Sequence, residues 1–273
     1  MILHRITIQN YGAVDHFECD FEDSLNIVKS RYTDELAQVI RLVLGHKGSS
    51  LPEYRARGNA RIEAWVRVAD KEYRVVVNLK SPAERLCLRA YDKDGNDQTK
   101  EYLYLTSHCL EQDLSDVFYG HDDKTLFRLL QYLDEDRYFG PRELSVRTDK
   151  LSEIKAFRSY LKAFIKDFRP ELIREGKRYE LYLESSGKYV VRHVDDNGCS
   201  VFLSESEETL FRYLCFLKTA EFWHGFEELR NLNGIKKPLI VEGFLERLDE
   251  SIDVSDLLQR TLRLKRQLIL LTV

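Results

Sequence analysis

The sequence places residues that could meet a phosphate group between a predicted strand and a predicted helix. The segment from Lys29 to Asp34 reads Lys-Ser-Arg-Tyr-Thr-Asp. A helix N-terminus attracts anions through its free N–H groups and its dipole, and Lys29 and Arg31 add positive charge near that end. Asp34 and Glu35 occupy the first helical turn with the opposite charge. Because these two carboxylates would repel a phosphate, the segment argues against phosphate binding, and weak anion binding through Lys29 and Arg31 is the less favoured alternative.

Two further groups of polar residues stand at the ends of predicted elements in the second half of the chain. Glu242 and Gly243 follow a short apolar strand, and Asp249 comes shortly after them. Ser204 precedes a long predicted helix with Glu207 three residues later, which is the Ser-x-x-Glu pattern of a capping box. The plainest interpretation makes Ser204 a helix cap and Asp249 a cap of the following turn.

Composition limits the class of protein. The chain has 273 residues, of which 43% are hydrophobic and 32% are charged, and its net charge is −4. These values fit a folded α/β domain with a sizeable core and exclude a disordered chain. They give no overall attraction to nucleic acid, so such a contact would need a local basic patch.

The sequence also predicts the compartment. No charged-then-apolar leader is visible at the N-terminus, and no apolar run approaches the roughly 20 residues that span a bilayer. The cysteines are scattered without C-x-x-C spacing, which argues against a zinc site or a disulfide framework. We therefore expect a cytoplasmic protein with no membrane partner and no bound metal. The cysteines are Cys19, Cys87, Cys109, Cys199 and Cys215.

Hydrophobic spacing predicts the elements that would position these residues. Strands are predicted in the first part at Ile2–Gln9, Phe17–Phe21, Leu25–Val28, Ile62–Val68, Tyr73–Leu79, Leu86–Tyr91 and Tyr102–Leu105. Helices are predicted at Leu36–Leu44, Leu110–Tyr119, Lys124–Leu133 and Asp149–Phe168, with a hinge at Tyr138–Pro141. The last part predicts strands at Tyr179–Leu183, Tyr189–His193, Cys199–Leu203, Leu239–Val241 and Gln267–Thr272, and helices at Glu205–Leu232 and Val254–Leu264. Strand–helix–strand at the end implies a parallel crossover, so we expect a mixed sheet with an antiparallel arm.

The order of these motifs resembles the ATPase heads of SMC, RecF and RecN proteins. Met1–Val14 is similar to the segment that opens such heads, and Ser200–Glu208 resembles the ABC signature at the start of its long helix. Lys237–Phe244 stands in the place of Walker B, and Leu248-Asp249 matches the D-loop. The strand Leu268–Thr272 looks like the one that leads to the switch histidine.

The resemblance covers residues 1–80 and 178–273 in the right order. It implies an ABC/SMC-head-like P-loop NTPase fold of the α/β class: a mixed sheet with an antiparallel arm, a central helical insert and a parallel core. The family's long coiled coil is missing, since only about 100 residues separate the arm from the signature region. We expect one head-like domain over 1–273, divided into an N-terminal lobe (1–105), a helical insert (106–175) and a C-terminal lobe (176–273).

The matching P-loop is degenerate. A P-loop has the form G-x-x-x-x-G-K-[ST], in which backbone N–H groups wrap the phosphates, lysine bonds them and the hydroxyl holds Mg²⁺. The segment from Lys29 through Ser30 and Arg31 to Asp34 contains no glycine. It is about three residues shorter than the P-loop of the resembling family. Aligned from the helix, Thr33 falls in the lysine position and Asp34 in that of the Mg²⁺-binding hydroxyl.

Other catalytic parts of the family pattern are also replaced. Walker B normally ends in Asp-Glu, which support Mg²⁺ and polarise water, but Glu242 and Gly243 stand there. Glu205 and Ser206 replace the signature glycines, and the switch histidine would have to follow Thr272. The sequence therefore predicts a pseudo-ATPase with no catalytic residues and no cofactor. ATP and Mg²⁺ would bind only if this alignment exaggerates the motif loss.

A basic cluster after the first helix offers a different contact. Its residues could follow a phosphate backbone, as the resembling heads bind DNA, or could simply form a solvated face. They are Lys47, Arg55, Arg57, Arg61 and Arg67.

Three functions remain open from sequence. The first is an inactive head that acts as a protein-interaction or regulatory subunit, as a homodimer or as a heterodimer with an active ATPase head. Its contact surface would be the signature and D-loop positions Leu203, Ser204, Glu205, Ser206, Glu207 and Asp249. The second is a weak or unusual ATPase in DNA repair, maintenance or defence, and the third is a DNA-binding module that uses the basic cluster.

Overall fold

The described part of the chain forms three sheets with helices packed between and beside them. It is a computed structural model, and it describes residues 1–46, 56–79, 87–107, 117–119, 178–183, 189–194, 200–202, 204–229 and 235–273. The predicted helices Lys124–Leu133 and Asp149–Phe168 and the hinge Tyr138–Pro141 lie outside the described residues. No helix in the described part of the chain is long and apolar enough to cross a membrane.

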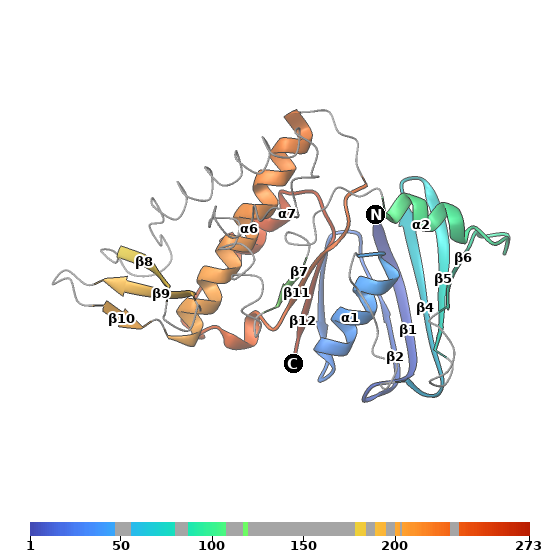
Figure 1. Ribbon diagram of the computed structural model, residues 1–273, viewed down its shortest axis with the longest axis horizontal. Coiled ribbons are helices and arrows are strands. Elements are labelled where there is room, and N and C mark those ends of the chain that lie inside the picture. Colours follow the sequence, from blue (N-terminus) through green and yellow to red (C-terminus); the bar gives the residue numbers. More distant parts are fainter. Residues whose placement is uncertain are drawn as a thin grey trace, which may run out of the picture.

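The first sheet is antiparallel and has the order β2-β1-β4-β5-β6 (Figure 1). Its strands are β1 (Ile2–Tyr11), β2 (Val14–Asp20), β4 (Ala56–Val68), β5 (Lys71–Leu79) and β6 (Cys87–Tyr91). From Ala60 to Val68, strict alternation buries every second residue of β4, such as Ile62, Ala64 and Val66, and exposes the residues between them to different degrees. One face of this sheet therefore carries the core.

The second sheet is parallel and has the order β3-β12-β11-β7. Its strands are β3 (Leu25–Lys29), β7 (Val117–Tyr119), β11 (Leu239–Glu242) and β12 (Leu268–Thr272). All residues of β11 and β12 are buried, as expected for parallel strands covered on both faces. A small third sheet has the order β10-β9-β8, formed by β8 (Arg178–Leu183), β9 (Tyr189–Val194) and β10 (Ser200–Phe202).

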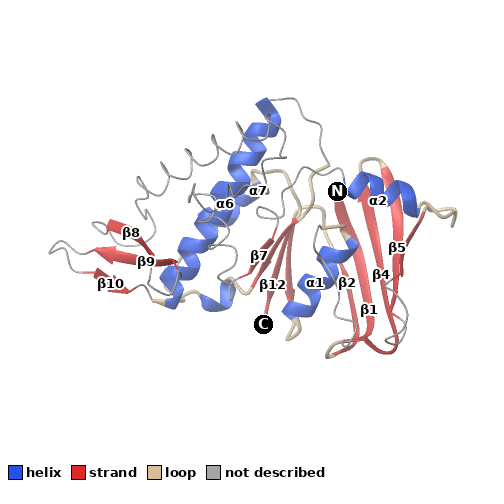
Figure 2. Cartoon of the chain, viewed as in Figure 1, coloured by secondary structure: helices blue, strands red, loops and turns tan. Residues whose placement is uncertain are grey.

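Helix α1 (Thr33–Val43) lies between the antiparallel and parallel sheets (Figure 2). Apolar residues at helical spacing, including Leu36, Val39 and Ile40, form its buried face. They join one core cluster with residues of both sheets, such as Ile62 and Ile269. This helix therefore packs against both sheets, and the packing positions its first residue, Thr33.

The second core lies on the other face of the parallel sheet, beneath α6 (Glu205–Leu229) and α7 (Ser255–Leu262). It centres on Phe244, whose ring stacks on Tyr213 with 4.0 Å between centroids and meets Phe118 edge-on. The hydroxyl groups of Tyr213 and Thr261 are 2.9 Å apart and share a hydrogen bond. Burial raises the pKa of Tyr213 to about 12, so this phenol stays neutral.

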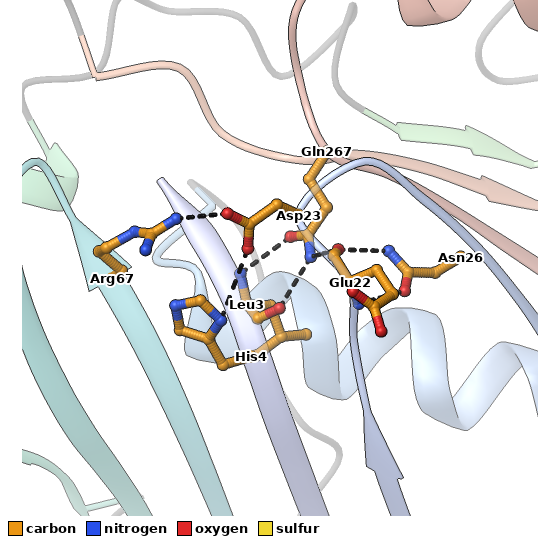
Figure 3. Close-up of polar contacts among 7 residues, drawn as sticks. All are labelled: Leu3, His4, Glu22, Asp23, Asn26, Arg67 and Gln267. Carbon is orange, nitrogen blue, oxygen red and sulfur yellow. Dashed lines mark hydrogen bonds and ion pairs between the residues drawn. The ribbon is translucent and has the colours of Figure 1, made fainter.

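Gln267 joins the two large sheets at the start of β12 (Figure 3). Its side-chain oxygen accepts from the Leu3 N–H at 2.8 Å, and its amide nitrogen donates to the Leu3 and Glu22 carbonyls, each at 2.8 Å. Nearby, Arg67 donates to Asp23 at 2.7 Å. These contacts hold the beginning of β1 against the beginning of β3 and β12.

The structure corrects three expectations. Tyr102–Leu105 is not a strand but part of helix α2 (Thr99–Ser107), because Tyr102 and Thr106 must lie on one buried helical face against the end of α1. Val117–Tyr119 does not end a helix but forms β7, where it gains backbone bonds to β11. The antiparallel and parallel strands form separate sheets and not one mixed sheet, since α1 lies between them.

His46, at the end of the α1 region, predicts a pH dependence of stability. Its side chain is buried, and burial followed by the positive charges of Lys237, Arg41 and Arg266 holds its pKa well below the usual 6.5. The unfolded chain therefore binds a proton that the folded chain excludes. The resulting stability is present above about pH 6.5 and is lost as pH falls, by up to about 1.4 kcal/mol per pH unit.

Urea unfolding between pH 5 and pH 7.5 measures this effect. We expect the free energy of unfolding of His46→Gln to depend less on pH below 6.5 than that of the unchanged chain. Equal slopes for the two proteins would contradict the assignment to His46.

Candidate site at the carboxyl ends of the parallel strands

The connection from β3 to α1 is short. It consists of Ser30, Arg31 and Tyr32 only. The Ser30 N–H donates to Thr272 O at 2.8 Å, and the Tyr32 N–H donates to Ser30 Oγ at 3.1 Å. Two backbone N–H groups of this turn therefore already donate hydrogen bonds within the protein, one to β12 and one to a side chain of the turn itself. Lys29 and Arg31 are exposed, and the Arg31 guanidinium lies 4.7 Å from the centre of the Tyr32 ring.

Thr33 and Glu242 meet across the site. The Thr33 hydroxyl donates to Glu242 Oε1 at 2.8 Å, although 209 positions separate the two residues. Both side chains are buried, at 8% and 4% exposure. The structure therefore brings the first residue of α1 into direct contact with the last residue of β11, the two positions that the sequence alignment matches to the P-loop lysine and to Walker B. A threonine makes this contact with a neutral hydroxyl, where a P-loop lysine would supply a positive charge to phosphate.

The first turn of α1 carries the two carboxylates that the sequence places there. Asp34 accepts a hydrogen bond from Gln38 at 2.9 Å. Glu35 lies beneath the β1–β2 turn, where Gly12 has φ +59° and a Cβ added to it would come 2.9 Å from Glu35 Cγ. The positive end of the helix dipole is thus complemented by side chains of the same helix.

Gly243 and its neighbours close the other side of the site. Gly243 has φ +68°, a conformation that disfavours side chains, and its N–H donates to Leu271 O at 3.1 Å. Because of this φ angle, a glutamate in place of Gly243 would need a strained backbone. Nearby, the Thr272 hydroxyl donates to Glu246 Oε2 at 3.0 Å. Among the described residues, no group of three or more His, Cys, Asp and Glu side chains is arranged to hold a metal ion.

Breaking the Thr33 contact gives a direct test of this geometry. We expect Thr33→Val, which keeps the side-chain shape but removes the hydroxyl, to lower the free energy of unfolding by about 2 kcal/mol, because a buried carboxylate loses a donor. Chemical denaturation measures the change. In Glu242→Met, which has no side-chain oxygen to accept the bond, the same valine substitution should cost clearly less, and an equal cost in both backgrounds would contradict a Thr33–Glu242 interaction.

The signature-like segment forms a capped helix start. The Ser204 N–H donates to Glu207 Oε2 at 3.0 Å, and the Glu207 N–H donates to Ser204 Oγ at 3.2 Å, which confirms the predicted capping box. Leu203 lies outside the described residues. The helix start is also tied to the D-loop-like segment, since Arg247 donates to Glu205 at 2.6 Å and the Asp249 N–H donates to Ser206 at 2.8 Å.

Asp249 has the predicted local role. Its carboxylate accepts from the Ser251 N–H at 3.2 Å and from the Ser251 hydroxyl at 3.1 Å. Glu205 remains 70% exposed despite its contact with Arg247. The predicted contact residues are therefore brought together on one exposed surface formed by the start of α6 and the segment after β11. We call the described residues Ser204–Glu207, Arg247 and Asp249 the α6-start surface.

The basic cluster is only partly described. Arg61 forms an ion pair with Glu63, and Arg67 forms one with Asp23. Arg57 lies within β4, whereas Lys47 and Arg55 lie outside the described residues. The described arginine side chains of the cluster are thus neutralised by carboxylates, which weakens their attraction for a phosphate backbone.

Comparison with solved structures defines the class of fold. No protein-family model and no curated protein sequence matches the chain. Its fold, with an antiparallel sheet, a parallel sheet and α1 between them, is similar to that of solved Smc head domains. The Smc head bound to the C-winged helix domain of ScpA is 14% identical, with a TM-score of 0.57 over 99% of this chain and 89% of that chain.

Two further structures are similar. The Smc head with an extended coiled coil, bound to the C-terminal domain of ScpA derived from Pyrococcus furiosus, is 14% identical, with a TM-score of 0.51 over 99% of this chain and 89% of that chain. The recombination mediator protein RecF with ATP is 18% identical, with a TM-score of 0.49 over 99% of this chain and 93% of that chain. The two Smc heads confirm the Smc-head-like fold expected from the order of the motifs.

Proposed function

We propose that this chain is a head-type subunit that does not hydrolyse ATP and acts by binding another protein. The observation that carries the proposal is the buried hydrogen bond between Thr33 and Glu242. In the proposed alignment with ATPase heads, this bond takes the place at which a P-loop lysine, a nucleotide phosphate and a Walker B carboxylate would meet. The short connection before Thr33 and the acidic first turn of α1 support the same conclusion.

Hydrolysis would require groups that the site does not supply. A base must orient water near the γ-phosphate, and cations must balance the charge that develops there. Gly243 has no side chain, Glu242 is engaged by Thr33, and Asp34 adds negative charge at the helix start. Steady release of phosphate from Mg-ATP would therefore favour the alternative function, a weak or unusual ATPase.

The α6-start surface is the contact that we propose for the partner. Both similar Smc heads were solved with a part of ScpA bound, so heads of this fold do bind other proteins. In this chain the surface is held together internally by the Arg247–Glu205 and Asp249–Ser206 bonds. Preformed contact residues lose less conformational entropy on binding. A second copy of this chain or an active ATPase head is the partner expected from the position of this surface.

Size measurements test the proposed association. Gel filtration of a native lysate and sedimentation of the pure chain should show a species larger than the 32.2 kDa monomer in at least one of them. Glu205→Arg should abolish the larger species, because it reverses an exposed charge on the α6-start surface. Glu72→Arg, an equal charge reversal on β5, is the control and should leave the size unchanged. A monomer under both conditions would refute the proposal.

A further inference from the structure

Within the described residues, β3 is the outermost strand of the parallel sheet. On its inner side, Ser24 O accepts from the Leu268 N–H at 2.7 Å and the Ser30 N–H donates to Thr272 O at 2.8 Å. Backbone groups of a strand point alternately to its two edges, so the even-numbered residues from 24 to 30 face β12. No other strand pairs with β3 in the described part of the chain. The residues whose N–H and C=O groups face outward are Leu25, Ile27 and Lys29.

This edge also carries an exposed apolar side chain. Ile27 is 52% exposed, although its neighbour Val28 on the opposite face of the strand is 7% exposed and packs in the core with α1. Edge strands are usually protected by charged side chains. The outer strand of the antiparallel sheet, β2, has such protection in the exposed residues Glu18 and Asp20. Within β3 only Lys29, at its end, is charged.

We propose that the β3 edge receives an extended segment of a partner protein, which adds to the sheet as a fifth strand. The N–H and C=O groups of the edge alternate along the strand, and only another polypeptide strand supplies acceptors and donors in the same alternation. We expect the partner strand to place an apolar residue beside Ile27, because that side chain is exposed and apolar. Lys29 and Arg31 are exposed at the carboxyl end of β3 and select a carboxylate there. This inference rests on the fold and not on the proposed loss of ATP hydrolysis.

A designed peptide tests the proposal without knowledge of the natural partner. The probe is fluorescein-labelled Glu-Val-Thr-Val-Thr-Val-Glu, which has apolar residues on one face and a carboxylate at either end. We expect saturable binding in fluorescence anisotropy and at least a ten-fold loss of affinity when all peptide amides are N-methylated. Ile27→Lys should cause a similar loss. Leu103→Lys, which changes a side chain 46% exposed on α2, should bind like the unchanged chain.

Hydrogen exchange measured by NMR locates the contact. The amides of Ile27 and Lys29 should exchange at least ten-fold more slowly when the peptide is bound, because they become donors in the new ladder. Unchanged exchange at these amides, equal binding of the methylated peptide, or no binding at millimolar peptide would each overturn the proposal. A dimer of the pure chain that Ile27→Lys dissociates would also overturn it and would assign the edge to a second copy. Glu205→Arg should leave peptide binding unchanged, which separates this inference from the α6-start surface.

Discussion

Replacement of Gln267 by alanine is expected to lower the free energy of unfolding by about 3–5 kcal/mol. The side chain bonds Leu3 through both its N–H and its C=O, and it also bonds the Glu22 carbonyl. Leu3 and Gln267 are almost fully buried, so water does not readily replace these bonds. Each buried backbone group left without its partner costs about 1–3 kcal/mol.

Urea unfolding followed by circular dichroism measures the loss at Gln267. Gln259→Ala, a change of the same side chain at an exposed position of α7, is the matched control and should alter the stability by less than about 0.5 kcal/mol. A loss at Gln267 no larger than that at Gln259 would show that this side chain does not hold the two sheets together.

Truncation of Phe244 to alanine is expected to cost about 3–5 kcal/mol. Its ring is 1% exposed, stacks on Tyr213 and meets Phe118 edge-on, so its removal leaves a cavity between α6 and the parallel sheet. Because Phe244 follows Gly243 directly, the same cavity should loosen the segment that carries the α6-start surface.

Thermal unfolding and urea unfolding of Phe244→Ala and Phe244→Leu test this second prediction. The leucine variant retains much of the buried volume and should lose less stability than the alanine variant. Leu103→Ala, at a half-exposed position on α2, should stay within about 1 kcal/mol of the unchanged chain. Equal losses for Phe244→Leu and Phe244→Ala would contradict the cavity explanation.

Local patterns predicted most strands and the first helix. Ile62 to Val68 alternates strictly because one face of β4 is buried, and the spacing from Leu36 to Leu44 reflects the buried stripe of α1. Tyr102–Leu105 was predicted wrongly as a strand, since a short run of large apolar residues fits either period. Its helical state is decided by tertiary contacts, including the hydrogen bond from the Tyr102 hydroxyl to Val43 O.

Long-range polar contacts were beyond the reach of sequence patterns. The sequence singled out Thr33 and Glu242 separately, but nothing in it indicates that they bond across 209 positions. Gln267 was read as the first residue of a strand, yet it lies just before β12 and its side chain joins two sheets. The capping box at Ser204 was predicted because both partners lie within one helical turn. Side-chain contacts between residues close in sequence could be predicted, whereas contacts between residues far apart in sequence could not, whatever their chemical type.

The most direct test of the proposed loss of nucleotide binding is thermal unfolding with and without Mg-ATP. A ligand present at a hundred times its dissociation constant adds about 2.7 kcal/mol to the stability of the folded state. The bond between Thr33 and Glu242, the short connection before α1 and the acidic first turn together predict no shift of the melting temperature at millimolar Mg-ATP. An increase of several degrees that depends on the ATP concentration would contradict the account.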